Sequence, residues 1–448
     1  MKKIIRLFCK ISVLAFLICA GIMFVSGSNV NASGVSEYGA LSVNGTKLTS
    51  KKTGKEVVLR GVSTHGINWD VGYPYVSKAA FKSLRDDYGV NAIRLAMYTT
   101  EYFGYCDKGS AGESQSKVQS TLKERIDTGV KACTDLDMYV IIDWHILNDQ
   151  NPNKYKKQAK AFFKEMSKKY AGQDNVIYEI CNEPNGGTTW SDITKYAKEI
   201  IPVIRENDSD AVIIVGTPTW SQDVDVAAEK PLPYDNIMYT LHFYSATHKD
   251  SYREKLKTAI KKGLPVMVTE FGVSEASGAG SIDTAEAKKW LDLLDANGIS
   301  YFAWSLSNKD ESASLLKAGT SKKSGWKSSD LSKAGKWVFG QYKSRNGKST
   351  ASVSKPAKVT GLKLKNIKSR KLKITYKSQT GADGYQILYS TNKKFKSAKK
   401  KTVKKGTVTL TKLKKGKTYY VKVRAYKVYS GSKKFGDFSG VKRIKIKK

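Results

Sequence analysis

The chain has few cysteines and few histidines for its length. Five cysteines and four histidines occur among 448 residues, and no CxxC motif is present. No cysteine–histidine cluster has the spacing of a zinc site. Cys9 and Cys19 lie near the N-terminus, which leaves Cys106, Cys133 and Cys181 as an odd, sparse set that is not a disulfide framework. We therefore expect a core that rests on packing, and a chemistry that needs neither a metal nor another cofactor.

Long apolar runs are absent except at the N-terminus. There a basic head with Lys2, Lys3 and Arg6 precedes an apolar run from Ile11 to Val25, and small residues follow up to Ala32. This order is typical of a secretory signal peptide. We expect residues 1–32 to be removed and the protein to be secreted. A retained membrane anchor is the alternative, since the run is only somewhat short for a transmembrane helix.

Acidic residues are scarce in the last hundred positions. Residues 349–448 carry 31 Lys and Arg against only Asp383 and Asp437, a net charge of +29. The other 348 residues carry 47 basic against 38 acidic residues, a net charge of +9. The basic tail suits an anionic surface such as a cell wall or an acidic polysaccharide. A solvated spacer without a ligand is the alternative. We expect no nucleic-acid partner, because the tail has no recognition motif.

Short apolar runs alternate with amphipathic stretches between residues 57 and 306. The runs are nearly continuous in apolar residues, which indicates strands that are buried on both faces. Helix-like segments lie between them, for example 154–170, 193–207, 251–262 and 284–297. The eight expected strands span residues 57–62, 92–97, 139–145, 176–184, 212–217, 237–244, 265–272 and 299–306. The pattern predicts an α/β fold, a closed (β/α)8 TIM barrel. An open doubly wound sheet is the alternative, but no Gly-rich phosphate loop follows the first strand.

Two smaller units flank the expected barrel. Residues 38–56 resemble a hairpin with Asn44-Gly45 as its turn. After a polar linker at 343–355, short strands at 371–376, 384–389, 407–410 and 419–426 predict a small all-β sandwich over residues 356–448. The expected catalytic domain is therefore 33–342, and we expect the protein to be a monomer.

Polar side chains cluster where the apolar runs end. Asp143-Trp-His145 ends the third run, Asn182 and Glu183 end the fourth, and Glu270 ends the seventh. In a parallel barrel all these ends face one rim, where such barrels carry their active sites. Burying so many polar groups would be costly unless they satisfied one another around a site. Two carboxylates on one rim are the minimum equipment for cleaving a glycosidic bond.

Several motifs resemble glycoside hydrolase family 5. They are Asn-Glu-Pro at 182–184, Thr-Glu-Phe-Gly at 269–272, Asp-Trp-His at 143–145 and His-Phe-Tyr at 242–244. The stretches at 63–69, 142–147, 219–224 and 307–312 resemble the bacterial endo-1,4-β-glucanase (cellulase) subfamily. The resemblance covers roughly residues 36–345. The tail resembles a fibronectin type III domain, mainly through residues 381–387 and 418–426.

The resemblance implies a retaining double displacement. It makes Glu183 the acid/base and Glu270 the nucleophile, with like-charge repulsion from Glu270 raising the pKa of Glu183. Supporting roles would fall to Arg94, His145, Asn182, His242, Tyr244 and Trp304. Contacts to a β-1,4-glucan would come from His65, Trp69, Tyr98, Trp220, Lys309 and Glu311.

Other readings of the same residues stay open. A β-mannanase or a mixed-linkage β-glucanase would use the same core. A protein of a different class, which binds glycans or adheres to the cell wall through a catalytically inactive barrel, is another alternative. Such a protein would not need the complete pair of glutamates.

Overall fold

Eight parallel strands close into a barrel, as the apolar runs predict. In this computed structural model the described residues are 34–346, 356–368, 370–379, 382–404, 406–429 and 432–447. The barrel order is β10-β3-β4-β5-β6-β7-β8-β9. These strands are β3 (Arg60–Thr64), β4 (Ala92–Tyr98), β5 (Tyr139–His145), β6 (Val176–Glu179), β7 (Ile213–Val215), β8 (Ile237–Tyr244), β9 (Val266–Gly272) and β10 (Tyr301–Leu306). The predicted signal peptide lies outside the described residues.

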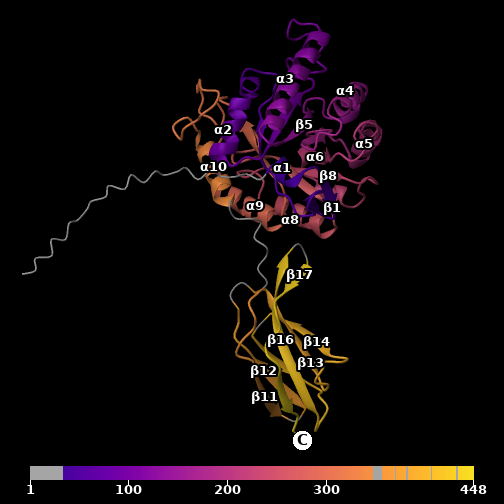
Figure 1. Ribbon diagram of the computed structural model, residues 1–448, viewed down its shortest axis with the longest axis vertical. Helices are drawn as coiled ribbons and strands as arrows, with labels where there is room; N and C mark the ends of the chain where they lie inside the picture. Colours follow the sequence, from indigo (N-terminus) through magenta and orange to yellow (C-terminus); the bar gives the residue numbers. More distant parts are fainter. Residues whose placement is uncertain are drawn as a thin grey trace, which may run out of the picture.

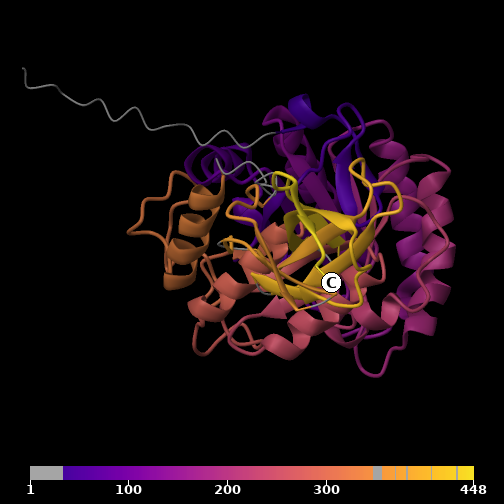
Figure 2. The same cartoon turned by 90° about the horizontal axis from the view of Figure 1, so that it is seen from below.

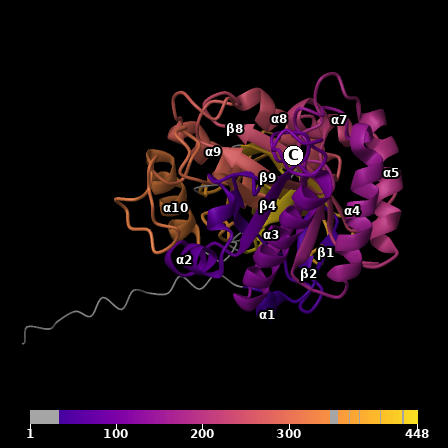
Figure 3. The ribbon, with the colours of Figure 1, turned by 90° about the horizontal axis from the view of Figure 1, so that it is seen from above.

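Helices surround the barrel in a ring (Figures 1, 2 and 3). The longer ones are α2 (Lys78–Tyr88), α3 (Gln115–Asp135), α4 (Lys156–Lys169), α5 (Trp190–Arg205), α8 (Asp250–Lys261), α9 (Thr284–Ala296) and α10 (Lys333–Arg345). Short helical turns are α1 (Val35–Tyr38), η1 (Tyr73–Tyr75), η2 (Pro152–Tyr155), α6 (Pro218–Ser221) and α7 (Val224–Ala227). Within the described part of the chain, no helix has the length and apolar character that crossing a membrane requires.

Side chains on the barrel strands alternate between two cores. On β5, Tyr139 and Ile141 belong to the cluster inside the barrel, whereas Val140 and Ile142 belong to the cluster between strands and helices. The same alternation continues to the end of the strand. It places Asp143 and His145 on the inner side, at the rim that we expect to carry the site.

Six of the eight expected strands have different bounds, and two of them differ by three residues or more at one end. The first begins at Arg60 and not at Val57, because the Val57 amide donates to the carbonyl of Leu48 (2.8 Å) and the Leu59 amide donates to the Ser300 hydroxyl (2.9 Å), so neither amide pairs with a neighbouring barrel strand. The fourth ends at Glu179 and not at Pro184. Beyond it the Asn182 amide donates to the carbonyl of Trp144 (3.2 Å), and proline has no amide hydrogen to continue the ladder. Glu183 therefore lies in a loop and not at a strand end.

The flanking hairpin and the tail also form. In the hairpin, β1 (Leu41–Asn44) pairs with β2 (Lys47–Ser50), and Gly45 has φ 58° in the turn. The helix α10 runs to Arg345, into the segment that we assigned to the linker. The sandwich has one sheet of β11 (Lys363–Lys368), β12 (Lys371–Thr375) and β15 (Thr407–Leu410). Its other sheet holds β13 (Gly384–Ser390), β14 (Lys399–Val403), β16 (Thr418–Tyr429), β17 (Ser432–Phe435) and β18 (Lys442–Lys445).

Candidate active site

A β-bulge in β9 turns Glu270 into the barrel. Between Thr240 and His242 on β8 there is one residue, but their partners Met267 and Glu270 are separated by two. The extra residue disrupts strict alternation and re-aims the side chains that follow it. Thr269 and Glu270 therefore both reach the polar interior, where Thr269 contacts Glu179 and Glu270 contacts Arg94.

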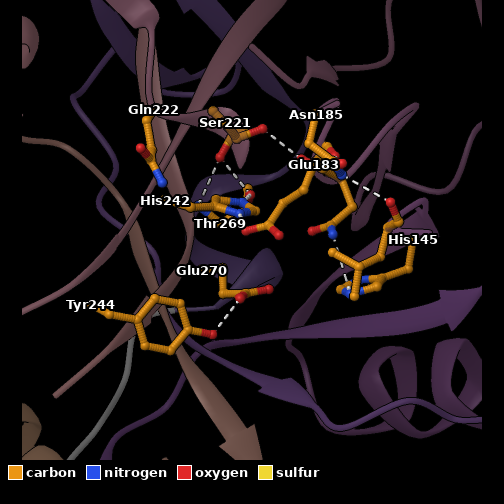
Figure 4. Close-up of polar contacts among 12 residues, drawn as sticks. His145, Glu183, Asn185, Ser221, Gln222, His242, Tyr244, Thr269 and Glu270 are labelled. Atoms are coloured by element: carbon orange, nitrogen blue, oxygen red, sulfur yellow. Dashed lines mark hydrogen bonds and ion pairs between the residues drawn. The ribbon is translucent and has the colours of Figure 1, made fainter. Parts of the chain in front are cut away.

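Glu183 and Glu270 lie together at the rim of the barrel. One carboxylate oxygen of each lies within 4.8 Å of the other and of a ring nitrogen of His242. The Glu183 side chain is 12% exposed and that of Glu270 is 5% exposed. Figure 4 shows both carboxylates directed at the same space, with Tyr244 beside Glu270 and His242 beside Glu183. Both can therefore reach one bond of a ligand in the cleft.

Arg94 is the cation that holds this group of acids together. It is fully buried on β4 and donates to Glu179 through Nε (2.8 Å) and Nη2 (3.1 Å), and to Glu270 Oε2 through Nη1 (3.0 Å). Its Nη2 also lies 3.0 Å from Asp143 Oδ2 and donates to Asn182 Oδ1 (2.6 Å). Burial alone would lower the pKa of Arg94, but the three carboxylates raise it. One guanidinium thus orients four side chains around the site.

Glu270 is fixed on both oxygens. Arg94 occupies Oε2, and the Tyr244 hydroxyl donates to Oε1 at 2.6 Å (Figure 4). Both contacts therefore hold the Glu270 carboxylate in a defined orientation.

Glu183 has the opposite character. Burial raises its pKa to about 8, with Arg94 opposing the rise and the charges of Asp143 and Glu179 adding to it. Our expectation that repulsion from Glu270 causes the shift is therefore wrong in its main cause. Desolvation in the polar floor of the barrel dominates, and the like charges that contribute are those of Asp143 and Glu179. The two carboxyl groups therefore lie in different environments, with Glu183 desolvated and Glu270 in contact with Arg94 and Tyr244.

His145 and Asn182 form a second pair behind Glu183. The Asn182 amide group donates to His145 Nε2 (3.2 Å) and to the carbonyl of Ile146 (3.1 Å). His145 Nδ1 lies 2.6 Å from Asp143 Oδ2, and burial lowers the pKa of His145 well below its usual range. A neutral His145 with its proton on Nδ1 satisfies both neighbours. Asn182 would have to exchange one of these bonds to donate to a ligand.

A cleft of about 560 Å³ opens above these residues. Its lining includes both glutamates and every residue predicted to contact a glycan, namely His65, Trp69, Tyr98, Trp220, Lys309 and Glu311. His145, His242, Tyr244 and Trp304 of the predicted supporting set also line it. Arg94 and Asn182 are fully buried and act from behind the cleft wall. The structure thus brings all the predicted residues to one place.

Aromatic rings cover much of the cleft wall. Trp69 lies 4.5 Å from Tyr98 between ring centroids, and its indole nitrogen donates to the carbonyl of Tyr102 (2.7 Å). Trp304 stacks on His145 at 5.4 Å and is 7% exposed. Flat apolar faces of this kind suit the faces of sugar rings.

Trp220 stands on a strained backbone. Thr219, Trp220 and Ser221 all have positive φ values, of 56°, 53° and 54°. Residues other than glycine rarely adopt this backbone conformation, and it persists only where surrounding contacts stabilise it. Here the Trp220 amide donates to the carbonyl of Pro184 (3.0 Å), and the Ser221 hydroxyl donates to the carbonyl of Asn182 (2.5 Å). The result presents a 45% exposed indole at the cleft and ties it to the Glu183 loop.

Charged groups form one end of the cleft wall. Lys309 Nζ lies 2.6 Å from Glu311 Oε2, and His65 Nε2 lies 3.8 Å from Glu311 Oε1. Burial, together with the charge of Lys309, lowers the pKa of His65 to about 3. His65 Nδ1 accepts a hydrogen bond from the Gly66 amide (2.8 Å), so a neutral His65 carries its proton on Nε2. At 3.8 Å that proton makes no hydrogen bond to Glu311, so it can be donated to a ligand hydroxyl.

The distances among Glu183, His242 and Glu270 would also allow a cation. Their atoms are, however, already engaged with one another and with Arg94 and Tyr244. A metal ion would have to compete with the buried guanidinium of Arg94 for Glu270. The donor set therefore suits proton and carboxylate chemistry better than metal binding.

Sequence reasoning missed several residues of the site. Glu101, Gln222 and His248 line the cleft, and Glu179 and Thr269 belong to the buried network below it. Glu179 could have been found from the sequence, because an ionisable residue inside an apolar strand needs a buried partner. Glu101 and Gln222 lie in loops, where the sequence pattern gives no position.

Comparisons with known proteins agree with this geometry. Residues 50–310 match the family described as cellulase (glycosyl hydrolase family 5), and residues 357–436 match the fibronectin type III domain. The chain is 51% identical over 306 residues to the endoglucanase A of Butyrivibrio fibrisolvens, covering 68% of each protein. It is 48% identical over 344 residues to an endoglucanase of Clostridium saccharobutylicum, covering 75% of this chain and 73% of that one.

A solved structure is similar as well. The catalytic domain of a Thermobifida fusca endoglucanase, a variant determined in complex with cellotetraose, superposes with a TM-score of 0.62 at 36% identity. The match covers 69% of this chain and 98% of that domain.

Proposed function

Because the chain belongs to glycosyl hydrolase family 5, we propose that it cleaves internal β-1,4-glucosidic bonds of cellulose and related β-glucans with retention of configuration. Glycoside hydrolase activity of the endoglucanase kind belongs to this family and its relatives. A silent barrel that only adheres to glycans, our alternative from another class, does not fit that membership. The proposal concerns the substrate, the stereochemistry and the residues.

One observation carries the mechanism, namely the short separation of Glu183 and Glu270. Retaining enzymes hold their two carboxyl groups about 5–5.5 Å apart, whereas inverting enzymes leave about 6.5–9.5 Å for a water molecule. The closest oxygens here lie within 4.8 Å. This supports direct attack by Glu270 on the anomeric carbon.

Proton transfer then follows from the raised pKa of Glu183. Glu183, with its raised pKa, donates a proton to the oxygen of the leaving sugar while Glu270 forms the covalent glycosyl-enzyme. Bond formation neutralises Glu270, and Glu183, now a carboxylate, takes a proton from the water that releases the sugar. Arg94 and Tyr244 hold the Glu270 carboxylate in the orientation for attack.

The cleft supports a β-glucan as the substrate. Trp69, Trp220 and Trp304 offer indole faces along the lining, and Lys309, Glu311 and His65 offer hydrogen-bonding groups beside them. A relative was determined in complex with cellotetraose. Mannan and mixed-linkage glucan remain the competing substrates, because they share the β-linked backbone.

A substrate panel tests the proposal. Purified protein should release soluble products from carboxymethyl-cellulose with a rapid fall in viscosity, and proton NMR should detect β-configured products first. Faster cleavage of mannan or lichenan than of carboxymethyl-cellulose would shift the assignment to those glycans. Initial release of α-configured products would overturn retention.

We also propose that the protein is secreted and that its tail adheres to anionic surfaces. The N-terminal signal pattern supports the first statement. The outer face of the β11-β12-β15 sheet supports the second, since β12 points Leu372 and Ile374 inward and leaves its lysines exposed. We refer to this surface as the lysine face, and it consists of the exposed residues Lys363, Lys365, Lys371 and Lys373. Among the described residues none of their amino groups has a hydrogen-bond or ion-pair partner.

A further inference from the structure

The hydroxyl of Thr269 contacts three polar groups below the cleft. It donates to Glu179 Oε1 at 2.8 Å, lies 2.6 Å from the hydroxyl of Thr240, and lies 2.9 Å from His242 Nε2. All four side chains are buried. Thr269 lies next to the His242 ring (Figure 4), whose Nε2 contacts Thr269 and whose Nδ1 contacts Glu183. None of the proposed catalytic steps uses Thr269 or Glu179.

Counting protons assigns each of these contacts a direction. Burial raises the pKa of Glu179, but two hydrogen bonds from Arg94 stabilise its ionised form, so that it only accepts. The single proton of Thr269 therefore points to Glu179. Thr240 accepts from the Thr269 amide (3.2 Å) and gives its own hydroxyl proton to the Thr269 oxygen. The second lone pair of that oxygen is left to accept from His242 Nε2.

This arrangement fixes the state of His242. A neutral imidazole with its proton on Nε2 has only a lone pair on Nδ1. His242 Nδ1 lies 2.9 Å from Glu183 Oε1. The contact is a hydrogen bond only if Glu183 carries the proton, so the neutral acid is the form that His242 accepts from.

We propose that Thr269, itself held by Glu179, is a positioning residue that keeps His242 in the Nε2–H tautomer and thereby keeps the reacting proton on Glu183. The proposal rests on the proposed glycosidase function of Glu183. It extends that function through a chain of contacts from β6 through β9 and β8 to the acid.

The charges around Glu183 are consistent with this role. Burial lowers the pKa of His242 to about 4, which keeps the ring neutral at the pH where Glu183 is still protonated. The titratable groups that face Glu183 come from five strands: Arg94 and Tyr98 on β4, Asp143 and His145 on β5, Glu179 on β6, His242 and Tyr244 on β8, and Glu270 on β9. Of these residues, only His242 forms a side-chain hydrogen bond with the Glu183 carboxyl group.

Removing the Thr269 hydroxyl should release this constraint. In Thr269→Val the shape is kept, but His242 Nε2 loses its acceptor. The ring can then move its proton to Nδ1 and donate to Glu183, which stabilises the carboxylate and lowers the pKa of the acid. Thr269→Ser keeps the hydroxyl and serves as the matched control.

The pH profile of the full-length enzyme tests the proposal. In Thr269→Val the alkaline limb of kcat/KM on a cello-oligosaccharide should shift to lower pH by about one unit or more, and Thr269→Ser should restore it. A dinitrophenyl cellobioside, whose leaving group needs no proton, should be cleaved at nearly the wild-type initial rate. An unshifted alkaline limb in Thr269→Val would overturn the relay, and equal losses on both substrates would assign Thr269 a role in placing Glu270 instead.

A second measurement reads the tautomer itself. Nitrogen NMR of the histidine rings in wild-type protein should show Nε2 of His242 protonated and Nδ1 unprotonated at pH 7. A proton on Nδ1 would overturn the proposal. If the wild-type enzyme cleaved no β-glucan at all, the glycosidase assignment would fail, whereas the NMR result would still report on the hydrogen-bond chain.

Discussion

Arg94 Nη1 lies 3.0 Å from Oε2 of Glu270, and this pair joins the buried charge network of the barrel to the surface of the cleft. Arg94 is fully buried, whereas Glu270 is 5% exposed at the bottom of the cleft. The guanidinium also pairs with Asp143 and Glu179. Among the described residues, no other lysine or arginine forms an ion pair with either of these two acids. Replacing Arg94 should therefore affect both the stability of the fold and the proposed reaction.

Replacing Arg94 should destabilise the fold. Arg94→Ala leaves Asp143, Glu179 and Glu270 buried without their cation, and breaking a buried pair in this way costs about 3–5 kcal/mol. Arg94→Lys keeps the charge but loses the fork of donors, so its loss should be smaller. Urea unfolding of both variants measures the difference. Equal stability of Arg94→Ala and wild type would contradict a supporting role for this residue.

Replacing either glutamate should abolish most of the activity while the fold survives. Glu183→Gln removes the general acid, which is worth about 10²- to 10⁴-fold, and Glu270→Gln removes the nucleophile, which should cost at least as much. The rates on carboxymethyl-cellulose and the thermal midpoints measure both effects. Glu101→Gln, which changes another carboxylate of the cleft, is the control and should keep most of its turnover. Near-wild-type hydrolysis by either of the first two variants would end the assignment.

The raised pKa of Glu183 predicts a pH dependence of stability as well as of rate. Its pKa rises from 4.5 to about 8 on folding, so the folded state binds more protons than the unfolded state between these values. The stabilisation of the folded state by protonated Glu183 is therefore complete below about pH 4.5, and it is lost as the pH rises through about 8. Relative to wild type, Glu183→Gln should become more stable as the pH rises from 5 to about 9. Unfolding curves at several pH values check the sign, and a constant difference would contradict the shift.

The sequence predicted the barrel because its strands are buried on both faces. Runs such as 139–145 and 237–244 are continuous in apolar residues, and their bounds agree with β5 and β8. The polar residues at the run ends located the site for the same reason, since parallel strands end at one rim.

The rest of the site depends on backbone detail that alternation does not encode. Strict alternation would place Thr269 and Glu270 on opposite sides of β9, and only the bulge turns both inward. In the tail, we did not identify β11, β14, β17 and β18. Their exposed positions are rich in lysine, so β14 shows no alternation of apolar and polar residues.

Trp220 should affect substrate binding more than turnover or folding. Its indole is 45% exposed at the cleft, and an aromatic contact contributes about 0.5–1.5 kcal/mol beyond its buried area. We therefore expect Trp220→Ala to raise KM for cellohexaose several-fold, with little change in kcat or in the thermal midpoint. Tyr73→Ala provides a control, because Tyr73 is an exposed aromatic residue that does not line the cleft. An unchanged KM would remove Trp220 from the binding surface.

The lysine face should make the enzyme adhere to anionic polymers in a salt-dependent way. We expect the full-length protein to bind a polygalacturonate gel at low salt and to be released at about 0.5 M sodium chloride. Dissolved salt weakens the attraction between exposed charges that lie farther apart than the screening length, which is about 10 Å or less. Changing Lys363, Lys365, Lys371 and Lys373 to Gln should weaken this binding more than changing Lys393, Lys394, Lys415 and Lys417, which are exposed in loops of the same sandwich. Equal weakening by the two sets would mean that only the net charge of the tail matters. Retention that is independent of salt would indicate a specific glycan pocket, since an electrostatic contact of exposed lysines cannot resist screening.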